Sequence, residues 1–441
     1  MTGREATVIG GGLAGCEAAW QLAQHEIRVR LVEMKPTRRS PAHHSDRLAE
    51  LVCSNSFRSD RLSNAVGLLK EEMRIMGSLI MKCADSTRVP AGGALAVDRD
   101  LFSEMVTESI KNHPNIYTDH TEAAWIPEGP SIIATGPLTS EALSEAIAGL
   151  PGLSTLNFFD AAAPIVTKDS LNDNKLFRLS RYNRGSDYLN APMNEEEYGV
   201  FIRELLNAET APVHGFEESM VFEGCMPIES MAKRGYMVPA FGPMKPVGLI
   251  DPRTGKEPFA VVQLRQDDAA DTLYNLVGFQ TRLKFGEQKR VFGLIPGLEN
   301  AEFARYGVMH RNTFLNSPGF LNASFEMIDR KQCFFAGQIS GVEGYVESAA
   351  SGLVAGITLA AELNEREVPV FPPSTALGAM GRHVSTPNQN FQPMNCSFGL
   401  IDPLPVRPGE KRLRNKQDRY QAVADRALQY IRAMSEKTGG K

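Results

Sequence analysis

The sequence predicts an α/β fold, in which a Rossmann-type nucleotide-binding domain is discontinuous in the chain and interrupted by an inserted α+β domain. Three observations lead to this prediction. A strand, a glycine-rich turn and an Ala-rich helix open the chain. A short apolar strand ending in glycine recurs at residues 131–137, and a further strand, glycine turn and helix occupy residues 332–356. Between these two segments, residues 155–325 lose the strand–glycine–helix rhythm and become rich in Pro, Met and basic residues.

The first element is the segment ATVIGGGLAGCEAAWQLAQHEIRVRLVEM, residues 6–34, in which Gly10, Gly12 and Gly15 form the pattern G-x-G-x-x-G. In a dinucleotide-binding unit the first glycine makes the tight turn. The second lets the backbone approach the pyrophosphate, and the third lets helix and strand pack closely. Glu33 ends the second strand, where a carboxylate can accept hydrogen bonds from the ribose hydroxyls. A plain Gly-rich turn is the alternative, but the order of strand, turn, helix and acid favours a dinucleotide-binding site.

The next two elements, SIIATGP and QCFFAGQISGVEGYVESAASGLVAG, resemble segments of flavoproteins of the glutathione-reductase type. In those proteins an A-T-G segment returns to the FAD site, and a late A-G strand is followed by a helix that points its N-terminus at the flavin. The resemblance implies FAD rather than NAD. A helix that begins near Gly344 would stabilise the negative charge of a reduced flavin, although it could also be a buried packing element. The residues implied to lie at the cofactor are Thr135, Gly136, Gly337, Gln338 and Gly344.

The region between these elements is expected to form the inserted domain. The expected divisions are residues 1–154 and 326–441 for the two parts of the FAD-binding domain and 155–325 for the insertion. Within the insertion, DYLNAPMNEEEYGVFIRELLNAE predicts a short strand and an amphipathic helix capped by Asn194. No second G-x-G-x-x-G occurs there, so a separate nicotinamide-binding Rossmann domain is not expected. The buried face of this helix should carry Tyr198, Phe201 and Leu205, and a basic C-terminal helix is expected from Lys416 to Ser435.

Composition indicates a globular, cytoplasmic protein. Of 441 residues, 42% are hydrophobic and 22% are charged, which is ordinary for a folded chain. The N-terminus has no basic stretch followed by an apolar core, and SAASGLVAGITLAAEL is too short and polar to span a bilayer. A net charge of −5 gives no overall attraction to nucleic acid, so any such surface must be a local patch.

The cysteines show no metal-binding or disulfide pattern. All six lie far apart without a C-x-x-C pair, which predicts free thiols. The neighbours His43 and His44 lie near Asp46, but no third ligand recurs at a suitable spacing, so no metal is expected. The six are Cys16, Cys53, Cys83, Cys225, Cys333 and Cys396.

Taken together, the motifs resemble the folate- and FAD-dependent tRNA uracil-5-methyltransferases, smaller relatives of the GidA-type tRNA-modifying flavoproteins. The resemblance runs nearly from end to end of the chain. The long helical C-terminal region of the GidA relatives is not found in this sequence. It is carried by VIGGGLAGCEAAW, LVCSNSFRSD, FEGCMPIESMAKRG, YGVMHRNTFLNSP and AGQISGVEGYVESAASGLVAG.

The resemblance implies methylation of C5 of a T-loop uridine in tRNA. The one-carbon unit would come from methylenetetrahydrofolate and the electrons from NAD(P)H through FAD. The two cysteines of the family correspond to Cys53 and Cys225. Uracil C5 is too electron-poor to attack a methylene carbon until a nucleophile adds at C6, and a thiolate suits that role. We favour Cys225 as nucleophile and Cys53 as proton-transfer partner, with Arg58 and Arg61 as possible sources of positive potential beside Cys53.

Two further residues are candidates for the folate site. His310 could stack on the pterin, or it could be an ordinary hydrogen-bonded loop residue, and Tyr345 is the second candidate. RNA would bind mainly through phosphates and shape. Three basic clusters could contact the phosphates, although such clusters are more often simply exposed to solvent. No stable protein partner is expected. The clusters are Lys175, Arg178, Arg181 and Arg184; Arg282, Lys284, Lys289 and Arg290; and residues 411–419.

Three alternatives remain open from the sequence. The first is GidA-like uridine modification. The second is a flavin oxidoreductase for a small molecule, which would turn over without RNA. The third is a flavoprotein that binds tRNA without catalysis, in which neither thiol would be needed.

Overall fold

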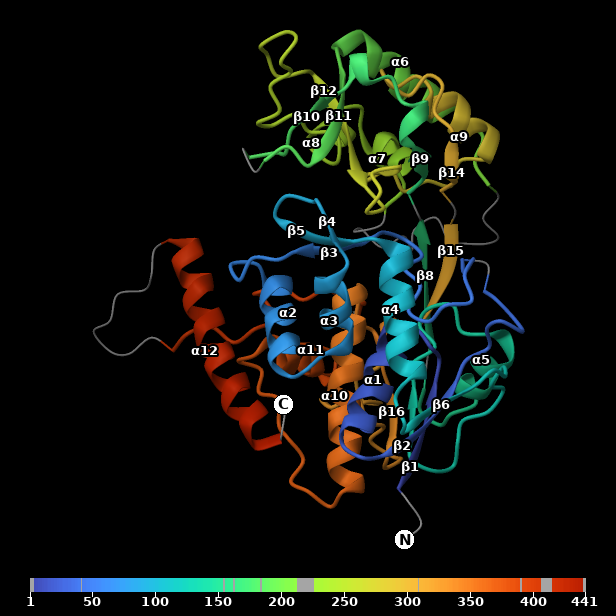
Figure 1. Cartoon of the computed structure of the whole chain (residues 1–441), viewed down its shortest axis with the longest axis vertical. Helices are drawn as coiled ribbons and strands as arrows, with labels where there is room; N and C mark the ends of the chain where they lie inside the picture. The colour runs from blue at the N-terminus through green and yellow to red at the C-terminus, as the bar shows by residue number, and fades with distance from the viewer. Residues whose placement is uncertain are drawn as a thin grey trace.

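The computed structural model describes residues 4–40, 42–153, 155–161, 163–182, 185–211, 226–307, 309–388, 391–405 and 415–438. For residues 155–161, 309–311 and 438 it describes the backbone alone. Two bodies follow one another along the long axis of the molecule (Figure 1). One is built on a parallel sheet and the other on an antiparallel sheet, and each has a hydrophobic core of its own.

The parallel-sheet body contains a five-stranded sheet in the order β16-β7-β1-β2-β6, and every neighbouring pair is parallel. Strands β1, β2, β6 and β7 come from the first third of the chain, whereas β16 comes from residues 333–335. The sheet therefore combines strands that precede the inserted region in the chain with one strand that follows it, which confirms the predicted discontinuous α/β fold. Its strands are β1 Glu5–Ile9, β2 Arg28–Val32, β6 Ile116–Asp119, β7 Ser131–Ile133 and β16 Cys333–Phe335.

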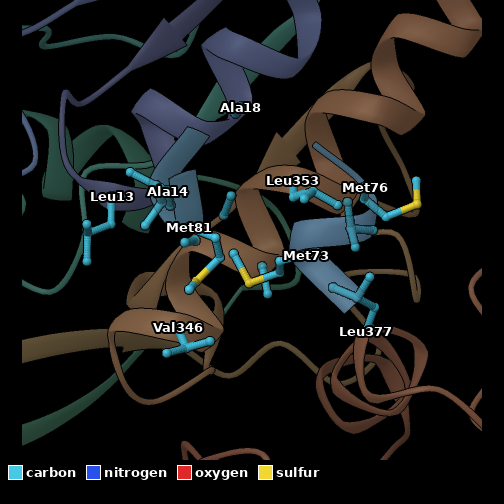
Figure 2. Packing of buried hydrophobic residues seen from close by; sticks show 14 of the residues in the cluster. Leu13, Ala14, Ala18, Met73, Met76, Met81, Val346, Leu353 and Leu377 are labelled. Carbon is cyan, nitrogen blue, oxygen red and sulfur yellow. The ribbon is translucent and has the colours of Figure 1, made fainter. Parts of the chain in front are cut away.

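Two helices rich in small residues pack closely beside this sheet. They are α1, Leu13–Gln24, and α10, Tyr345–Leu363. At Gly352 on α10 an added Cβ would lie 2.2 Å from the carbonyl oxygen of Ala14, so the backbones nearly touch. Figure 2 shows Leu13, Ala14 and Ala18 of α1 and Val346 and Leu353 of α10 in one buried cluster that also contains Met73, Met76 and Met81. One helix of the described chain, α10, is long and apolar enough to cross a membrane, but it is 83% buried as a core helix.

The rest of this body consists of helices and a small sheet around α1 and α10. The described C-terminal helix α12 continues to Thr438, three residues beyond the predicted end at Ser435. The small sheet has the order β3-β5-β4. These elements are α2 Ala65–Ile75, α3 Leu79–Ser86, α4 Arg99–Lys111, α5 Glu141–Ala148, α11 Ala376–Ser385, α12 Lys416–Thr438, β3 Ser56–Ser59, β4 Arg88–Val89 and β5 Ala94–Val97.

Buried carboxylates cap two of these helices. Glu17 accepts hydrogen bonds from the hydroxyl of Ser78 at 2.6 Å and from the amide of Ile80 at 3.0 Å, at the start of α3. Glu72 accepts from the amides of Ala376 and Leu377 at 2.8 and 2.9 Å, at the start of α11. Each carboxylate satisfies donors that a helix N-terminus leaves unpaired, and so joins α1 to α3 and α2 to α11.

The stability of the fold is expected to depend on pH through Glu72. Burial raises the pKa of Glu72 from 4.5 to about 8, against the effect of its two amide donors. Between these values the folded chain retains a proton that the unfolded chain has released, so the free energy of unfolding falls as pH rises through this window. The slope is at most about 1.4 kcal/mol per pH unit.

Urea unfolding of the protein and of a Glu72→Gln variant, measured at both ends of this window, checks the Glu72 prediction. The variant cannot titrate at this position, so its stability should fall less between the two pH values. Equal slopes for the two proteins would contradict the prediction.

The antiparallel-sheet body contains six strands in the order β10-β11-β12-β13-β9-β14. The strand and helix predicted for residues 187–209 are confirmed: Asn194 caps the helix in a capping box with Glu197, and Tyr198, Phe201 and Leu205 are buried. The elements are β9 Ile165–Thr167, β10 Phe177–Arg178, β11 Tyr188–Met193, β12 Ala260–Gln266, β13 Leu273–Leu276, β14 Phe303–Arg305, α6 Glu195–Asn207, α7 Ile228–Arg234, α8 Val238–Phe241 and α9 Phe285–Phe292, with short 3-10 turns at Lys168–Ser170 and Asp173–Lys175.

A two-stranded antiparallel ladder leads into and out of this body. It is formed by β8, Thr155–Ala161, and β15, Met309–Leu315. Figure 1 shows the ladder between the two sheets. The chain thus leaves the parallel-sheet body on β8 and returns on β15. The domain limits at residues 154/155 and 325/326 stay predictions.

Candidate functional site

The glycine-rich turn between β1 and α1 is constrained by close backbone approach. A Cβ at Gly15 would lie 1.8 Å from the carbonyl oxygen of Gly10. Gly10 itself has φ +101°, and a Cβ there would lie 2.6 Å from the carbonyl oxygen of Ala134. At Gly12, in contrast, a Cβ would meet nothing within 4 Å. The turn is therefore closed toward the protein and open at Gly12, which fits a phosphate group at the N-terminus of α1.

A cavity of about 80 Å³ adjoins this turn and is lined by two further predicted nucleotide-binding residues, Glu33 and Thr135. Glu33 follows β2 and is 7% exposed, and its carboxylate accepts hydrogen bonds from the amides of Gly11 at 2.6 Å and Lys35 at 2.9 Å. Thr135 lines the same cavity from the end of β7 and shares a hydrogen bond with Thr139 at 2.6 Å. The structure thus brings Glu33 and Thr135 together at one cradle, whereas their ribose and cofactor contacts stay predictions.

Of the remaining predicted cofactor residues, Gly337, Gln338 and Gly344 lie in the segment that leads into α10. Gly136 follows Thr135 with φ +68°, and the amide of Gly337 donates to the hydroxyl of Ser351 at 2.7 Å. Gln338 opens the 3-10 turn Gln338–Ser340, and Gly344 is the N-cap of α10. The predicted helix start near Gly344 is confirmed.

A second pocket, of about 300 Å³, lies between the two bodies. From the parallel-sheet body it is lined by Cys53, by Gln338 and by the first residues of α10. From the antiparallel-sheet body it is lined by Arg265, Asn275, Val277, Gly278 and Gln280. The pocket is therefore a joint product of both bodies, and it places a half-buried thiol beside a helix N-terminus.

Three arginines hold the loop that carries Cys53. Arg99 on α4 donates to the carbonyl of Leu51, and its Nε pairs with Asp267 at 2.8 Å. Arg305 on β14 donates to the carbonyl of Val52 at 3.2 Å. Arg265 on β12 donates to Ser54 Oγ at 2.7 Å and to Asn55 Oδ1 at 2.9 Å. Two of these arginines belong to the antiparallel-sheet body, so the docking of that body shapes the loop.

Tyr345 completes the support of the loop. Its hydroxyl accepts hydrogen bonds from the amides of Cys53 at 2.8 Å and Ser54 at 3.1 Å. Burial raises the pKa of the Tyr345 phenol, so the hydroxyl remains protonated. Tyr345 lines the pocket, but its polar end is engaged by the thiol-bearing loop. Its predicted contact with folate stays a prediction.

The positive charge expected from the sequence neighbours of Cys53 is arranged differently. Arg58 lines the pocket but forms an ion pair with the buried carboxylate of Glu347 on α10. Arg61 is exposed. The guanidinium groups that contact the Cys53 loop are Arg99, Arg265 and Arg305, which are remote in sequence. No local pattern points to them, because their contacts arise only when β12, β14 and α4 pack around the loop.

Two of the predicted site residues cannot be placed by their side chains. Cys225 lies outside the described residues. The chain resumes at Met226, and the amide of Ile228 then donates to the carbonyl of Gln280, a residue that lines the pocket. For His310 the backbone alone is described, and it pairs with Asp160 across the β8–β15 ladder. The roles of Cys225 and His310 stay predictions.

The other described cysteines are structural. Cys16, Cys83, Cys333 and Cys396 are all buried. Burial raises the pKa of the Cys83 thiol to about 11 and shifts that of Cys16 in the same direction. Thiols of this kind are poor nucleophiles near neutral pH. The structural reading of Cys16 and Cys333 is confirmed, and Cys53 is the one half-buried thiol among the described cysteines.

Several residues of the basic clusters predicted to contact RNA form ion pairs or hydrogen bonds within the protein. Lys175 pairs with Glu299, and Arg178 donates to the hydroxyl of Tyr274 at 2.8 Å. Arg290 pairs with Glu204 and Glu287. Among the residues that the structure describes, no group of three His, Cys, Asp or Glu is arranged to hold a metal ion. Arg184 and residues 411–414 lie outside the described part of the chain.

Comparison with known proteins shows where this architecture recurs. The family described as glucose inhibited division protein A, GIDA, matches residues 5–367. A methylenetetrahydrofolate--tRNA-(uracil-5-)-methyltransferase TrmFO of Acetivibrio thermocellus is 60% identical over 419 residues, which is 94% of this chain and 96% of that protein. The protein of the same name from Bacillus subtilis is 58% identical over 438 residues, 99% of this chain and 100% of its own length.

Two solved structures share the fold. Aquifex aeolicus GidA in one crystal form superposes with a TM-score of 0.72 at 15% identity, covering 99% of this chain and 74% of that chain. In a second crystal form the TM-score is 0.71 at 17% identity, covering 99% and 76%. At such identities the likeness establishes the fold alone.

Proposed function

The chain belongs to the GidA family and, within it, to the methylenetetrahydrofolate–tRNA-(uracil-5-)-methyltransferases, and from this premise we propose that it methylates C5 of a T-loop uridine in tRNA. Methylenetetrahydrofolate is the carbon donor. NAD(P)H is the proposed source of electrons, and the cytoplasm is the proposed site of action. The observation that carries this proposal is the pocket between the two bodies, which holds Cys53 beside the N-terminus of α10.

The cofactor is FAD, and the residues of the cradle fit it. The open space at Gly12 and the N-terminus of α1 would hold the pyrophosphate, and Glu33 would bind the ribose. The N-terminus of α10, capped by Gly344, would face the flavin end. When bound, FAD supplies the reducing electrons that turn a transferred methylene group into a methyl group.

The protein itself contributes thiol chemistry. A cysteine thiolate adds to C6 of uracil, so that a sulfur–carbon bond forms and the electron pair of the C5–C6 bond makes C5 nucleophilic. After C5 has gained its carbon, loss of the C5 proton and expulsion of the thiolate restore the ring. Cys53 lines the pocket. We assign one of these steps to Cys53 and the other to Cys225. His310 and Tyr345 are the proposed folate contacts.

One assay tests the proposed function. The purified protein is incubated with an unmodified tRNA transcript, NAD(P)H and either methylenetetrahydrofolate or S-adenosylmethionine, and the nucleosides are analysed by mass. We expect 5-methyluridine with the folate donor alone. Product formed with S-adenosylmethionine, or full consumption of the reductant without RNA, would contradict the proposal; the second result would favour a small-molecule oxidoreductase.

Arg265 is expected to act as a positioning residue in this reaction. An Arg265→Ala variant loses the hydrogen bonds to Ser54 and Asn55, so the loop that carries Cys53 can leave its catalytic position. A misplacement on the order of 1 Å costs roughly 100-fold in rate, so we expect a loss of about 10- to 100-fold in kcat with flavin absorbance retained.

The matched control for Arg265 is Arg253→Ala, in the same body, where the arginine forms a more exposed pair with Asp251. This substitution can lower stability, because Asp251 is buried, but Arg253 does not line the pocket, so methylation per folded molecule should be within about twofold of the unchanged protein. An Arg265→Ala variant as active as the Arg253→Ala control would contradict a positioning role.

A further inference from the structure

An apolar surface is exposed on the antiparallel-sheet body around α8. Phe241 at the end of α8 is 78% exposed, the highest value for a large hydrophobic side chain in the described part of the protein. Tyr236 and Val238 precede it, and Val247 and Ile250 follow it in the next loop. Figure 1 shows α8 and these loops on the antiparallel-sheet body. We call this surface the α8 platform, and it consists of Tyr182, Tyr236, Val238, Phe241, Val247 and Ile250.

The charges on the α8 platform are of one sign. Residues 230–250 contain Lys233, Arg234 and Lys245 and no Asp or Glu. The ammonium group of Lys245 lies 5.6 Å from the centre of the Tyr182 ring, so a cation already rests on one of the aromatic faces.

Most nearby carboxylates are paired or buried, and Glu257 is the one exposed negative charge beside the loop that follows α8. Glu257 accepts a hydrogen bond from the amide of Gly248 at 2.7 Å, Asp251 pairs with Arg253, and Glu229 on α7 is buried. Three basic residues, Lys233, Arg234 and Lys245, thus outnumber one exposed carboxylate. Exposed rings with an excess of positive charge match the stacking faces and phosphates of unpaired nucleotides.

Pro243, in the loop between Phe241 and Val247, connects the α8 platform to the pocket that holds Cys53. Gly278 lines that pocket, and a Cβ added to Gly278 would lie 2.5 Å from the side chain of Pro243. Pro243 follows α8 by two residues, and its carbonyl accepts a hydrogen bond from Arg181 at 2.7 Å. Pro243 therefore packs against the wall of the pocket, and the platform residues Phe241 and Val247 lie on either side of it in the chain. Nucleotides next to one that enters the pocket would pass over Pro243 onto these rings.

We propose that the α8 platform binds the unpaired nucleotides that flank the target uridine, with Phe241 stacking on a base and Lys245 contacting a phosphate. This inference rests on the proposed function, because it takes the pocket as the place where uracil reacts. A uridine in a folded loop must leave its stack to reach the pocket. Stacking of its neighbours on Phe241 and Tyr236 replaces base–base contacts that are lost on opening, and it tolerates any base identity.

Substitutions at Phe241 separate stacking from simple apolar contact. Phe241→Ala removes the ring, Phe241→Leu retains apolar volume, and Phe241→Tyr retains a ring. The affinity for a T-arm hairpin transcript is measured by fluorescence anisotropy with the flavin-loaded protein. We expect the Kd to rise roughly 5- to 100-fold for the Ala and Leu variants and to stay near the unchanged value for the Tyr variant. In the methylation assay KM for RNA should rise with kcat retained.

One control and one further test accompany these variants. Tyr117→Ala removes an aromatic side chain that is 52% exposed on β6, on the other body, and should leave the Kd unchanged. Lys245→Gln should lower the slope of log Kd against log salt by about one, as expected for one lost phosphate contact.

The outcomes separate this inference from the proposed function. If the unchanged protein methylates the transcript but the Ala, Leu and Tyr variants all bind RNA with the Kd of the unchanged protein, the α8 platform inference is overturned and the function stands. If no transcript is methylated yet the Ala and Leu variants lose RNA affinity, the function fails and the platform stands as an RNA surface. If Phe241→Ala alters only the sedimentation of the protein, the surface is a contact between protein chains and the inference is wrong.

Discussion

A Cys53→Ala variant is expected to retain its flavin and to lose methyl transfer. The Cys53 thiol lies in the pocket between the two bodies, whereas the nucleotide cradle lies around Gly12 and Glu33, so removal of the sulfur leaves the cofactor site intact. Loss of a nucleophile or of a proton-transfer group costs on the order of 100- to 10,000-fold in rate. The flavin spectrum and the yield of 5-methyluridine in single-turnover reactions measure the two effects separately.

Cys83→Ala is the matched control for Cys53. Cys83 is buried in α3, and its thiol pKa of about 11 makes it a poor nucleophile. Its substitution can lower stability but should leave the rate per folded molecule unchanged. Product formation by Cys53→Ala at the rate of the Cys83→Ala control would remove Cys53 from the mechanism, although the dinucleotide cradle would be unaffected.

Gly352→Ala is expected to destabilise the fold strongly. The added methyl group would lie 2.2 Å from the carbonyl oxygen of Ala14, and neither backbone can move without separating α10 from α1. Overpacking of a close-packed interior costs about 1–3 kcal/mol and sometimes more, and a clash between two backbones belongs at the upper end. We expect a loss of about 3 kcal/mol in the free energy of unfolding. Flavin affinity should fall as well, because the proposed FAD site lies at the N-termini of α1 and α10.

The matched control is Gly286→Ala in α9. It also replaces a helical glycine, but a Cβ at Gly286 would meet nothing within 4 Å. This substitution should raise stability by about 0.5–1 kcal/mol, because alanine restricts the unfolded chain more than glycine does. Chemical denaturation of both variants checks the pair. Equal stabilities for the two would show that α10 and α1 can separate at little cost.

Elements whose determinants are local were predicted well from the sequence. The turn at Gly10 and Gly15 and the capping box at Asn194 each depend on residues a few positions apart, and the acid at Glu33 ends the next strand of the same unit, so their signals can be read directly from the chain. The predicted end of the C-terminal helix at Ser435 was three residues short. The described helix reaches Thr438, and Gly439 follows at once; glycine is common just after the end of a helix, so the sequence held a stop signal beyond the predicted end.

The surroundings of Cys53 were predicted less well. The motif around Cys53 identified the thiol, and its nearest basic neighbours Arg58 and Arg61 were expected to provide positive potential. Arg58 instead pairs with Glu347, and the loop is held by Arg99, Arg265 and Arg305. Proximity in sequence was a poor guide here, because long guanidinium side chains reach the loop from whichever strands pack beside it.

By itself, the sequence determined the nucleotide cradle, the split α/β architecture and the thiol at Cys53. Tertiary structure alone decided which groups line the pocket, which arginines hold its loop, and that the α8 platform adjoins it. The physical reason is one of range. Turn geometry and helix capping act over a few residues, whereas the pocket exists only because two separately buried cores bring Cys53 and Arg265 together from distant parts of the chain.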